Sequence, residues 1–367
     1  MCSFHFVRIM PRRAQEIRYR NSIIIAALLF VGSTVAGAAG LRSPWDGTHV
    51  AMKDVPYDCP AVAHLSRDLI TQGFYSDAKS SVIDPEKWKA YVASSGPYKE
   101  LGQRIVDASD AYRSTGSRAA AECAVAHMTA AARDGVFTGN MSSRQAYYVQ
   151  GWVIGAITIA YLKVRDSGLI TNKEEQLLFP WLENVVAQSI AFYEKDGAKN
   201  NHLYWAGVES IAIGVATGNR RFFDWGIAAY RTGIDQIQPD GSLPLEMRRG
   251  QRALHYHLYA IAPLVYIAEF GMVNGTDLYA EKNQALARLV RLSINGMNDN
   301  EFFAKAAGVA QDTPNGKPAA EQISWAAIWQ SRFPDPQVAS LLAEATSMSY
   351  MYLGGLPPGI HEPAPMK

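Results

Sequence analysis

Hydrogen-bonding and stacking side chains are crowded at the start of one apolar segment. The stretch "KNNHLYWAGV", residues 199 to 208, places Asn200, Asn201, His202, Tyr204 and Trp205 directly before small and apolar residues. Such groups can donate hydrogen bonds to a carboxylate, transfer a proton or stack on a sugar ring. Either asparagine could cap a helix that starts here. The simpler interpretation is a helix cap followed by a buried histidine and core aromatics, because satisfied buried polar groups are common.

A second cluster of polar side chains follows about fifty residues later. The segment "EMRRGQRALHYHLYAIAP" spans residues 246 to 263, and no acidic residue occurs from position 247 to position 268. If the segment is helical, its arginines and tyrosines recur every three or four residues and share one face. Arginines without carboxylate partners indicate a site for an anion. The candidate residues of this segment are Arg248, Arg249, Arg252, His255, Tyr256 and Tyr259.

The elements that would position these clusters are helices. Helical patterns follow one another from residue 117 to residue 348, and alternating β-type patterns are scarce. Ser117 and Gly135 are placed to begin and end one helix, and Thr171 with Glu174 forms a capping-box pattern at the start of another. Helices joined by short connections predict an all-α chain of antiparallel pairs that closes into a toroid.

The remaining segments are predicted to be less regular. We expect residues 41 to 85 to mix loop with short helix, and the proline-rich tail "GGLPPGIHEPAPMK" to be a strap or a disordered end. No linker divides residues 40 to 367, so these residues are expected to form one domain.

The N-terminus has the order of a secretory signal. Five arginines precede the apolar run "SIIIAALLFVG", and the small residues "STVAGAAG" follow it. This order predicts a signal peptide over residues 1 to 39, cleaved near Ala38 or Ala39. The run is short for a membrane span, which disfavours an uncleaved anchor. We therefore expect a periplasmic or secreted protein that is not inserted in a membrane after cleavage. We also expect it to be a monomer.

Composition and charge restrict the class of ligand. The 367-residue chain is 48% hydrophobic and 19% charged, as in a globular protein. Without residues 1 to 39 it keeps 30 basic and 33 acidic residues, a net charge of −3. This balance argues against nucleic acid as a partner. An anionic ligand would have to bind in a locally positive cleft.

The cysteines predict a disulfide bond rather than a metal site. Loss of Cys2 with the signal leaves Cys59 and Cys123, which are expected to pair in an oxidising compartment. The alternative is two buried free thiols. No HExxH-like or CxxC spacing is present, so neither a metal nor a cofactor is expected.

The two clusters together resemble the alginate lyases of polysaccharide lyase family 5. "NNHLYW" and "RRGQRALHYHLYAIAPL" are similar to that family's NNHSYW-type and R-x-Q-R-A-x-x-Y-H segments, and "DCPAV" and "ECAVAH" are also similar to the family's cysteine contexts. The resemblance covers nearly the whole mature chain. It implies an incomplete (α/α) toroid that cleaves an anionic polysaccharide. Matched by position, the implied catalytic residues are Asn201, His202, Arg249 and Tyr256, with Trp205 as a subsite aromatic and, more loosely, Lys79 in a lid-like segment.

Such lyases cleave a 1→4 bond to a uronic acid by β-elimination. The substrate carboxylate must be neutralised, a base must remove the C5 proton, and an acid must protonate the departing O4. His202 and Asn201 are assigned the role of neutralising the substrate carboxylate. Because the C5 proton and O4 of mannuronate lie on one side of the ring, Tyr256 is favoured as base and then acid, with its pKa lowered by nearby arginines. The alternative makes His202 the base and Tyr256 the acid.

Other functions and the choice of substrate are also constrained. A toroidal glycoside hydrolase would need two carboxylic acids, for which Glu209 and Glu246 are available, although a helix-end or ion-pair role is expected for both. A non-catalytic uronate-binding protein would not need Tyr256.

The choice of substrate depends on residues near the catalytic groups. Leu203 and His255 replace small residues of the family pattern. His255 is therefore the candidate selector in an enzyme that cleaves polymannuronate, polyglucuronate and hyaluronate-like chains but little polyguluronate.

Overall fold

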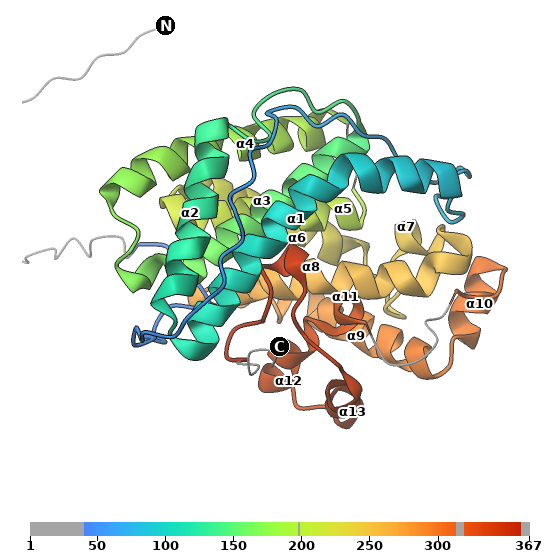
Figure 1. Cartoon of the computed structure of the whole chain (residues 1–367). Coiled ribbons are helices and arrows are strands. Elements are labelled where there is room, and N and C mark those ends of the chain that lie inside the picture. Colours follow the sequence, from blue (N-terminus) through green and yellow to red (C-terminus); the bar gives the residue numbers. More distant parts are fainter. Residues whose placement is uncertain (1–39, 197–198, 313–318, 361–367) are drawn as a thin grey trace, which may run out of the picture. The chain divides into compact units, whose positions relative to one another are not determined.

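The computed structural model describes residues 40–196, 199–312 and 319–360. These residues belong to one compact unit that begins at Gly40. The predicted signal peptide, residues 1 to 39, and the last seven residues of the tail lie outside the described residues. Within the described residues the chain forms helices and isolated β-bridges but no strand, which confirms the all-α prediction (Figure 1).

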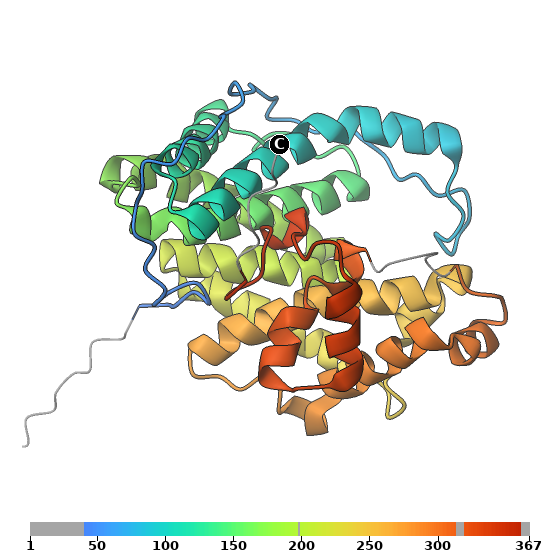
Figure 2. The ribbon, with the colours of Figure 1, turned by 60° about the horizontal axis from the view of Figure 1, so that its bottom comes forward.

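The helices form two layers of an incomplete toroid. α3, α5 and α8 are buried along nearly their whole length, whereas α6 and α9 bury one face only. Successive inner and outer helices pack in pairs, α1 with α2, α3 with α4, α5 with α6, and α8 with α9 (Figure 2). Their bounds are α1 (Pro85–Thr115), α2 (Arg118–Asp134), α3 (Arg144–Val164), α4 (Asn172–Asp196), α5 (Asn201–Thr217), α6 (Arg220–Gln236), α7 (Pro244–Met247), α8 (Ala253–Val273), α9 (Glu281–Asn298), α10 (Glu301–Ala307), α11 (Ala320–Ile323), α12 (Ala326–Arg332) and α13 (Pro336–Glu344).

The capping residues predicted from the sequence begin and end the helices. The Ser117 hydroxyl caps α2, which ends at Gly135 with a positive φ of 66°. Glu174 accepts hydrogen bonds from both the backbone N–H and the hydroxyl of Thr171 at the start of α4. Of the two asparagines at the start of α5, Asn200 is the cap, because its side chain accepts a hydrogen bond from the His202 N–H. Helix ends of this kind depend on local sequence alone.

The N-terminal segment differs from the prediction. Residues 40 to 84 contain no helix, and the 31-residue helix α1 then begins at Pro85. The Asp84 carboxylate caps α1 by accepting hydrogen bonds from the N–H groups of Glu86 and Lys87, at 3.0 Å each. The expectation of short helices before residue 85 was therefore wrong, since this stretch is extended and runs over the surface (Figure 1).

The arginine-rich segment is not one continuous helix. Gly250 has a φ of 59°, in the left-handed region that suits glycine, and α8 begins only at Ala253. A short 3-10 turn, Gly250–Arg252, joins α7 to α8. Arg249 thus precedes the helix that carries Tyr256, and the single helical stripe predicted for them was wrong. The bend turns Arg249 back towards Tyr256.

Helix α8 is unusually apolar for a helix of this protein. The stretch Gly250–Val273 could span a membrane by length and composition alone. However, 89% of its apolar window is buried inside the fold. A helix that is apolar on all sides belongs either to a membrane or to a protein core, and here it packs between α5 and α9.

The start of the proline-rich tail is a strap across α1 and α3. The Lys163 Nζ of α3 donates hydrogen bonds to the Asp110 carboxylate of α1 and to the Gly354 carbonyl, each at 2.5 Å. The same carboxylate accepts a hydrogen bond from the Leu356 N–H at 2.9 Å. A buried charge pair is stable only when its remaining hydrogen bonds are satisfied, and the strap supplies two of them.

Cys59 and Cys123 form a disulfide bond with their Cα atoms 5.6 Å apart. The bond ties the N-terminal extended segment to α2. Among the described residues these two sulfurs and His127 are the one group close enough to hold a metal ion. Sulfurs joined in a disulfide are not thiolate ligands, so the group does not offer a metal site.

Replacing both cysteines by serine is expected to lower the free energy of unfolding by ~4 kcal/mol, because the bond closes a long loop in the unfolded chain. Denaturant unfolding of wild type and of the Cys59→Ser/Cys123→Ser variant measures the difference. Specific activity of the folded variant should be unchanged, since neither cysteine lines the cleft described below. Two reactive thiols in unreduced, unfolded wild-type protein would contradict the expectation.

Candidate active site

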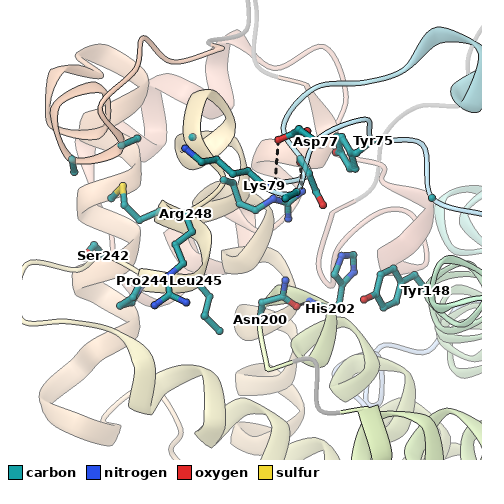
Figure 3. Close-up of a pocket in the computed structure, with 18 of the residues that line it drawn as sticks. Tyr75, Asp77, Lys79, Tyr148, Asn200, His202, Ser242, Pro244, Leu245 and Arg248 are labelled. Atoms are coloured by element: carbon teal, nitrogen blue, oxygen red, sulfur yellow. Dashed lines mark hydrogen bonds between the residues drawn. The ribbon is translucent and has the colours of Figure 1, made fainter.

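A cleft of about 1200 Å³, here called the main cleft, opens where the first turn of α5 faces the turn between α7 and α8. Residues 73 to 83, here called the lid, form its third wall. Figure 3 shows Tyr75, Asp77 and Lys79 of the lid opposite Asn200 and His202. The remaining wall comes from α3, α7 and α10, with Arg144, Gln145, Tyr148, Leu245 and Phe302 among its residues.

A smaller cavity of about 290 Å³, here called the inner pocket, adjoins the main cleft. The two cavities share Tyr75, Gln145 and His202 as lining residues. The inner pocket is mostly aromatic, with Trp88, Tyr91, Trp152, Tyr256, Tyr259, Tyr350 and Tyr352 in its walls. Arg252, His255, Lys99 and Glu321 also line it. Stacking surfaces with a few charged groups suit a sugar acid.

Tyr256 lies at the centre of a cluster of tyrosines and arginines. Its hydroxyl makes a short hydrogen bond with the hydroxyl of Tyr75. The Arg249 guanidinium carbon lies 3.4 Å from the centroid of the Tyr256 ring, and Arg252 donates a hydrogen bond to the Tyr75 hydroxyl at 3.3 Å. Sequence reasoning missed Tyr75. Its only signal was its position four residues before Lys79, in the segment that the resemblance implied to be lid-like.

Burial decides the protonation state of Tyr256. It raises the pKa of this phenol well above its ordinary value, and the opposing effect of Arg249 is smaller. The expectation that the arginines would lower the pKa overall was therefore wrong. The cations are where they were predicted, but loss of water around a phenolate outweighs them. Tyr256 is protonated at neutral pH.

His202 is held by ring stacking. Its imidazole lies 3.6 Å from the Tyr148 ring, centroid to centroid, with 8° between the planes. Burial lowers the pKa of His202 to about 3, with further lowering from Arg249 and Arg144. The ring is thus neutral above that pH. Its Nδ1 is buried without a hydrogen-bond partner among the described residues. A neutral imidazole with a free nitrogen is able to donate to, or accept from, a bound ligand.

The lid is anchored to the turn that carries the arginines. Arg249 donates a hydrogen bond to the Ser80 carbonyl at 2.7 Å, and Gln251 donates to the Ser81 carbonyl at 3.1 Å. Inside the lid the Asp77 carboxylate accepts hydrogen bonds from Ser81 and from the Val82 N–H. Burial alone would raise the pKa of Asp77, but these hydrogen bonds outweigh it and lower the pKa to about 2. Asp77 is therefore a structural anion of the lid.

The structure separates the predicted site residues into three groups. Lys79, Arg248, Arg249 and His202 line the main cleft. Arg252, His255, Tyr256 and Tyr259 line the inner pocket, with His202 at the border of the two. Asn201 is fully buried and lines neither cavity, and its backbone N–H donates a hydrogen bond to the Glu246 carboxylate.

Tyr204 and Trp205 do not present their rings to either cavity, contrary to expectation. Tyr204 is fully buried and its hydroxyl donates to Gln236 at 3.0 Å. Trp205 is 3% exposed and packs against Tyr259, which itself faces the inner pocket. Since α5 is an inner helix packed on nearly all sides, aromatics along it become core residues. The aromatic rings that do face the cavities come from the lid, α1, α3, α8, α10 and residues 350 to 352.

Comparison with known proteins identifies this arrangement. The family model described as alginate lyase matches residues 75–303 of the chain. The chain belongs to the alginate lyase family. A polysaccharide lyase of Stenotrophomonas maltophilia (strain K279a) is 37% identical over 281 residues, covering 76% of this chain and 82% of that protein. An alginate lyase of Pseudomonas fluorescens (strain SBW25) is 32% identical over 302 residues, covering 79% and 81%.

Solved alginate lyases share the fold. Alginate lyase A1-III from Sphingomonas species A1 superposes with a TM-score of 0.71 at 23% identity, covering 83% of this chain and 87% of that chain. A variant of the same enzyme complexed with tetrasaccharide superposes with a TM-score of 0.74, also at 23% identity, over 83% of this chain and 86% of that chain. The toroid is therefore that of alginate lyases, and the chain is a polysaccharide lyase.

The acidic residues of this alginate lyase do not form a hydrolase site. Glu246 has the helix-end role that was expected, because its carboxylate accepts a hydrogen bond from the Asn201 N–H at 2.8 Å. Glu209 is neither at a helix end nor in an ion pair with a described residue. It is fully buried, accepts a hydrogen bond from Ser189, and burial raises its pKa to about 8. Neither glutamate lines the main cleft or the inner pocket.

Proposed function

We propose that this alginate lyase cleaves the 1→4 bonds of polymannuronate by β-elimination at the border of the main cleft and the inner pocket. The observation that carries the proposal is a group of buried polar atoms in the walls of the two cavities that lack partners among the described residues: Nδ1 of His202, and Nε of Arg249 and Arg252. Buried polar groups normally find partners, so their gathering here indicates a polar ligand. A uronate carboxylate supplies acceptors for such donors.

The reaction follows from these groups. A hydrogen bond from His202 and the charge of Arg249 stabilise the carboxylate as negative charge develops on it. Arg249, at 3.4 Å from the Tyr256 ring, stabilises the phenolate form of Tyr256, which is the minor form at neutral pH, and this phenolate takes the C5 proton. The electron pair of the C5–H bond forms the C4–C5 double bond, and the C4–O4 bond breaks. Tyr256 then returns the proton to O4.

The alternative, in which His202 is the base and Tyr256 the acid, receives less support from the site. The lowered pKa of His202 makes its imidazole a weak base that would hold an abstracted proton poorly, whereas the phenolate form of Tyr256 is a strong base. A neutral imidazole is still a good hydrogen-bond donor to a carboxylate. We therefore assign His202 to the carboxylate and both proton transfers to Tyr256.

The breadth of substrate is tested by ultraviolet time courses, because elimination creates an absorbing unsaturated uronate. We expect cleavage of polymannuronate, measurable cleavage of polyglucuronate or hyaluronate-like chains, and little cleavage of polyguluronate. Mannuronate and glucuronate differ only at C2, whereas guluronate moves the C5 proton to the opposite face. Absence of any absorbance change on polymannuronate would refute the proposed function.

His255 is the proposed selector between the first two substrates. It lines the inner pocket beside Tyr256, and burial lowers its pKa to about 3, so it acts as a neutral hydrogen-bonding group rather than a charge. His255→Ala should therefore change the ratio of polymannuronate to polyglucuronate cleavage by about 10-fold, more than it changes the better rate. An unchanged ratio would show that His255 does not select between these two substrates.

We also propose that residues 1 to 39 direct export and that the lyase works in the periplasm or outside the cell. Two observations support this: the order of charged, apolar and small residues at the N-terminus, and the disulfide bond, which persists in oxidising compartments.

A further inference from the structure

We propose that the main cleft continues onto an accessory subsite between α3 and α4, which binds uronate residues of a long chain away from the reacting bond. This surface, here called the α3–α4 platform, is a hollow of about 420 Å³ lined by Ser143, Arg144, Tyr147, Gln188, Phe192 and Lys195 among others. The inference rests on the proposed function, since its ligand is the same polyuronate that the site cleaves.

Continuity with the main cleft is the first argument. Ser143 and Arg144, at the start of α3, line both the main cleft and the platform. The main cleft runs from α10, past the lid, to the first turns of α3, where Tyr148 stands beside His202 (Figure 3). A polymer longer than the main cleft and leaving it at this end passes directly over Arg144.

The charge of the platform is the second argument. Arg144 and Lys195 are both exposed, and neither forms a hydrogen bond or an ion pair with a described residue. No aspartate or glutamate is among the residues that line the hollow. An ordinary solvated surface mixes acids with its cations, and this chain without residues 1 to 39 is acidic overall. Two unpaired cations on an acidic protein match a ligand with a carboxylate on every sugar ring.

Aromatic packing is the third argument. The rings of Tyr147 and Phe192 stack with their centroids 4.2 Å apart and 6° between their planes. Tyr147 is half-buried, while Phe192 is buried beneath it. The stacking fixes the Tyr147 side chain, so little side-chain entropy is lost when a ligand packs on it. A fixed tyrosine next to two cations gives both an apolar contact and charge for a uronate ring.

The test compares two charge reversals on one helix, Lys195→Glu on the platform and Lys173→Glu in the first turn of α4. Both lysines are exposed, and the 22 positions between them place the control about 33 Å away at 1.5 Å per residue. KM and kcat are measured on polymannuronate and on oligomannuronates of increasing length. Tyr147→Leu, which keeps an apolar group over Phe192 but removes the aromatic ring, gives a second and charge-neutral probe.

For Lys195→Glu we expect KM on the polymer to rise about 5-fold with kcat unchanged, as for the loss and reversal of one partly exposed charge contact. Trisaccharide kinetics should match wild type, and the difference should appear only above a certain chain length. Lys173→Glu should match wild type at every length. The proposal that the platform binds substrate would be overturned by equal effects of both reversals, by an effect independent of chain length, or by no effect of Lys195→Glu. Wild type without activity on any mannuronate chain would instead overturn the proposed function.

Discussion

Tyr256→Phe is expected to lower kcat on polymannuronate by about 10²-fold or more and to leave KM nearly unchanged, because the lost hydroxyl acts mainly in the transition state. The variant removes one oxygen from a buried, well-packed ring, so the fold should persist. Initial rates are followed by the ultraviolet absorbance of the unsaturated product. Circular dichroism of the variant should match that of wild type.

Tyr259→Phe is the matched control for this substitution. Tyr259 lies one turn further along α8 and also lines the inner pocket, but its ring is not the one packed beneath Arg249. Removing its hydroxyl should change kcat by less than about 10-fold, as for a group outside the proton transfers. If Tyr256→Phe keeps near-wild-type turnover, the assignment of both proton transfers to Tyr256 is wrong.

Arg249→Ala is expected to reduce kcat by about 10²-fold, since the charge that stabilises both the substrate carboxylate and the Tyr256 phenolate is lost. The neighbouring substitution Arg248→Ala is the control for charge alone. Arg248 is exposed at the rim of the main cleft, and its loss should raise KM a few-fold with little effect on kcat. The comparison is made on polymannuronate at one ionic strength, because surface charges are screened by salt.

A second control separates the charge of Arg249 from its contact with the lid. Gln251 also binds the lid, through the Ser81 carbonyl, but carries no charge. If Arg249 acts only by holding the lid, Gln251→Ala should reduce kcat nearly as much as Arg249→Ala. We expect instead a reduction of less than about 10-fold for Gln251→Ala, as for the loss of one neutral hydrogen bond. Equal losses of kcat in the two variants would show that Arg249 positions the lid and takes no direct part in the reaction.

The local features of this protein were available in its sequence. The Ser117 cap, the Gly135 stop and the Thr171–Glu174 pair form within one helical turn, and the structure contains each of them. The two motif segments led to the alginate lyase family and to an all-α toroid. Such inferences succeed because a cap or a motif is a relation between residues a few positions apart, which the chain carries whatever its tertiary surroundings.

What only the tertiary structure decided are relations between distant segments and the effects of burial. Tyr75 meets Tyr256 across 181 positions, and no local pattern marks that pairing. In the sequence, Gly250 lies inside an apparent helix. In the structure its φ of 59° interrupts that helix, and Arg249 lies over the Tyr256 ring. The arginines were predicted to lower the pKa of Tyr256, yet removal of water by the surrounding helices raises it. Desolvation depends on every neighbour at once, so it becomes known only when the helices are packed together.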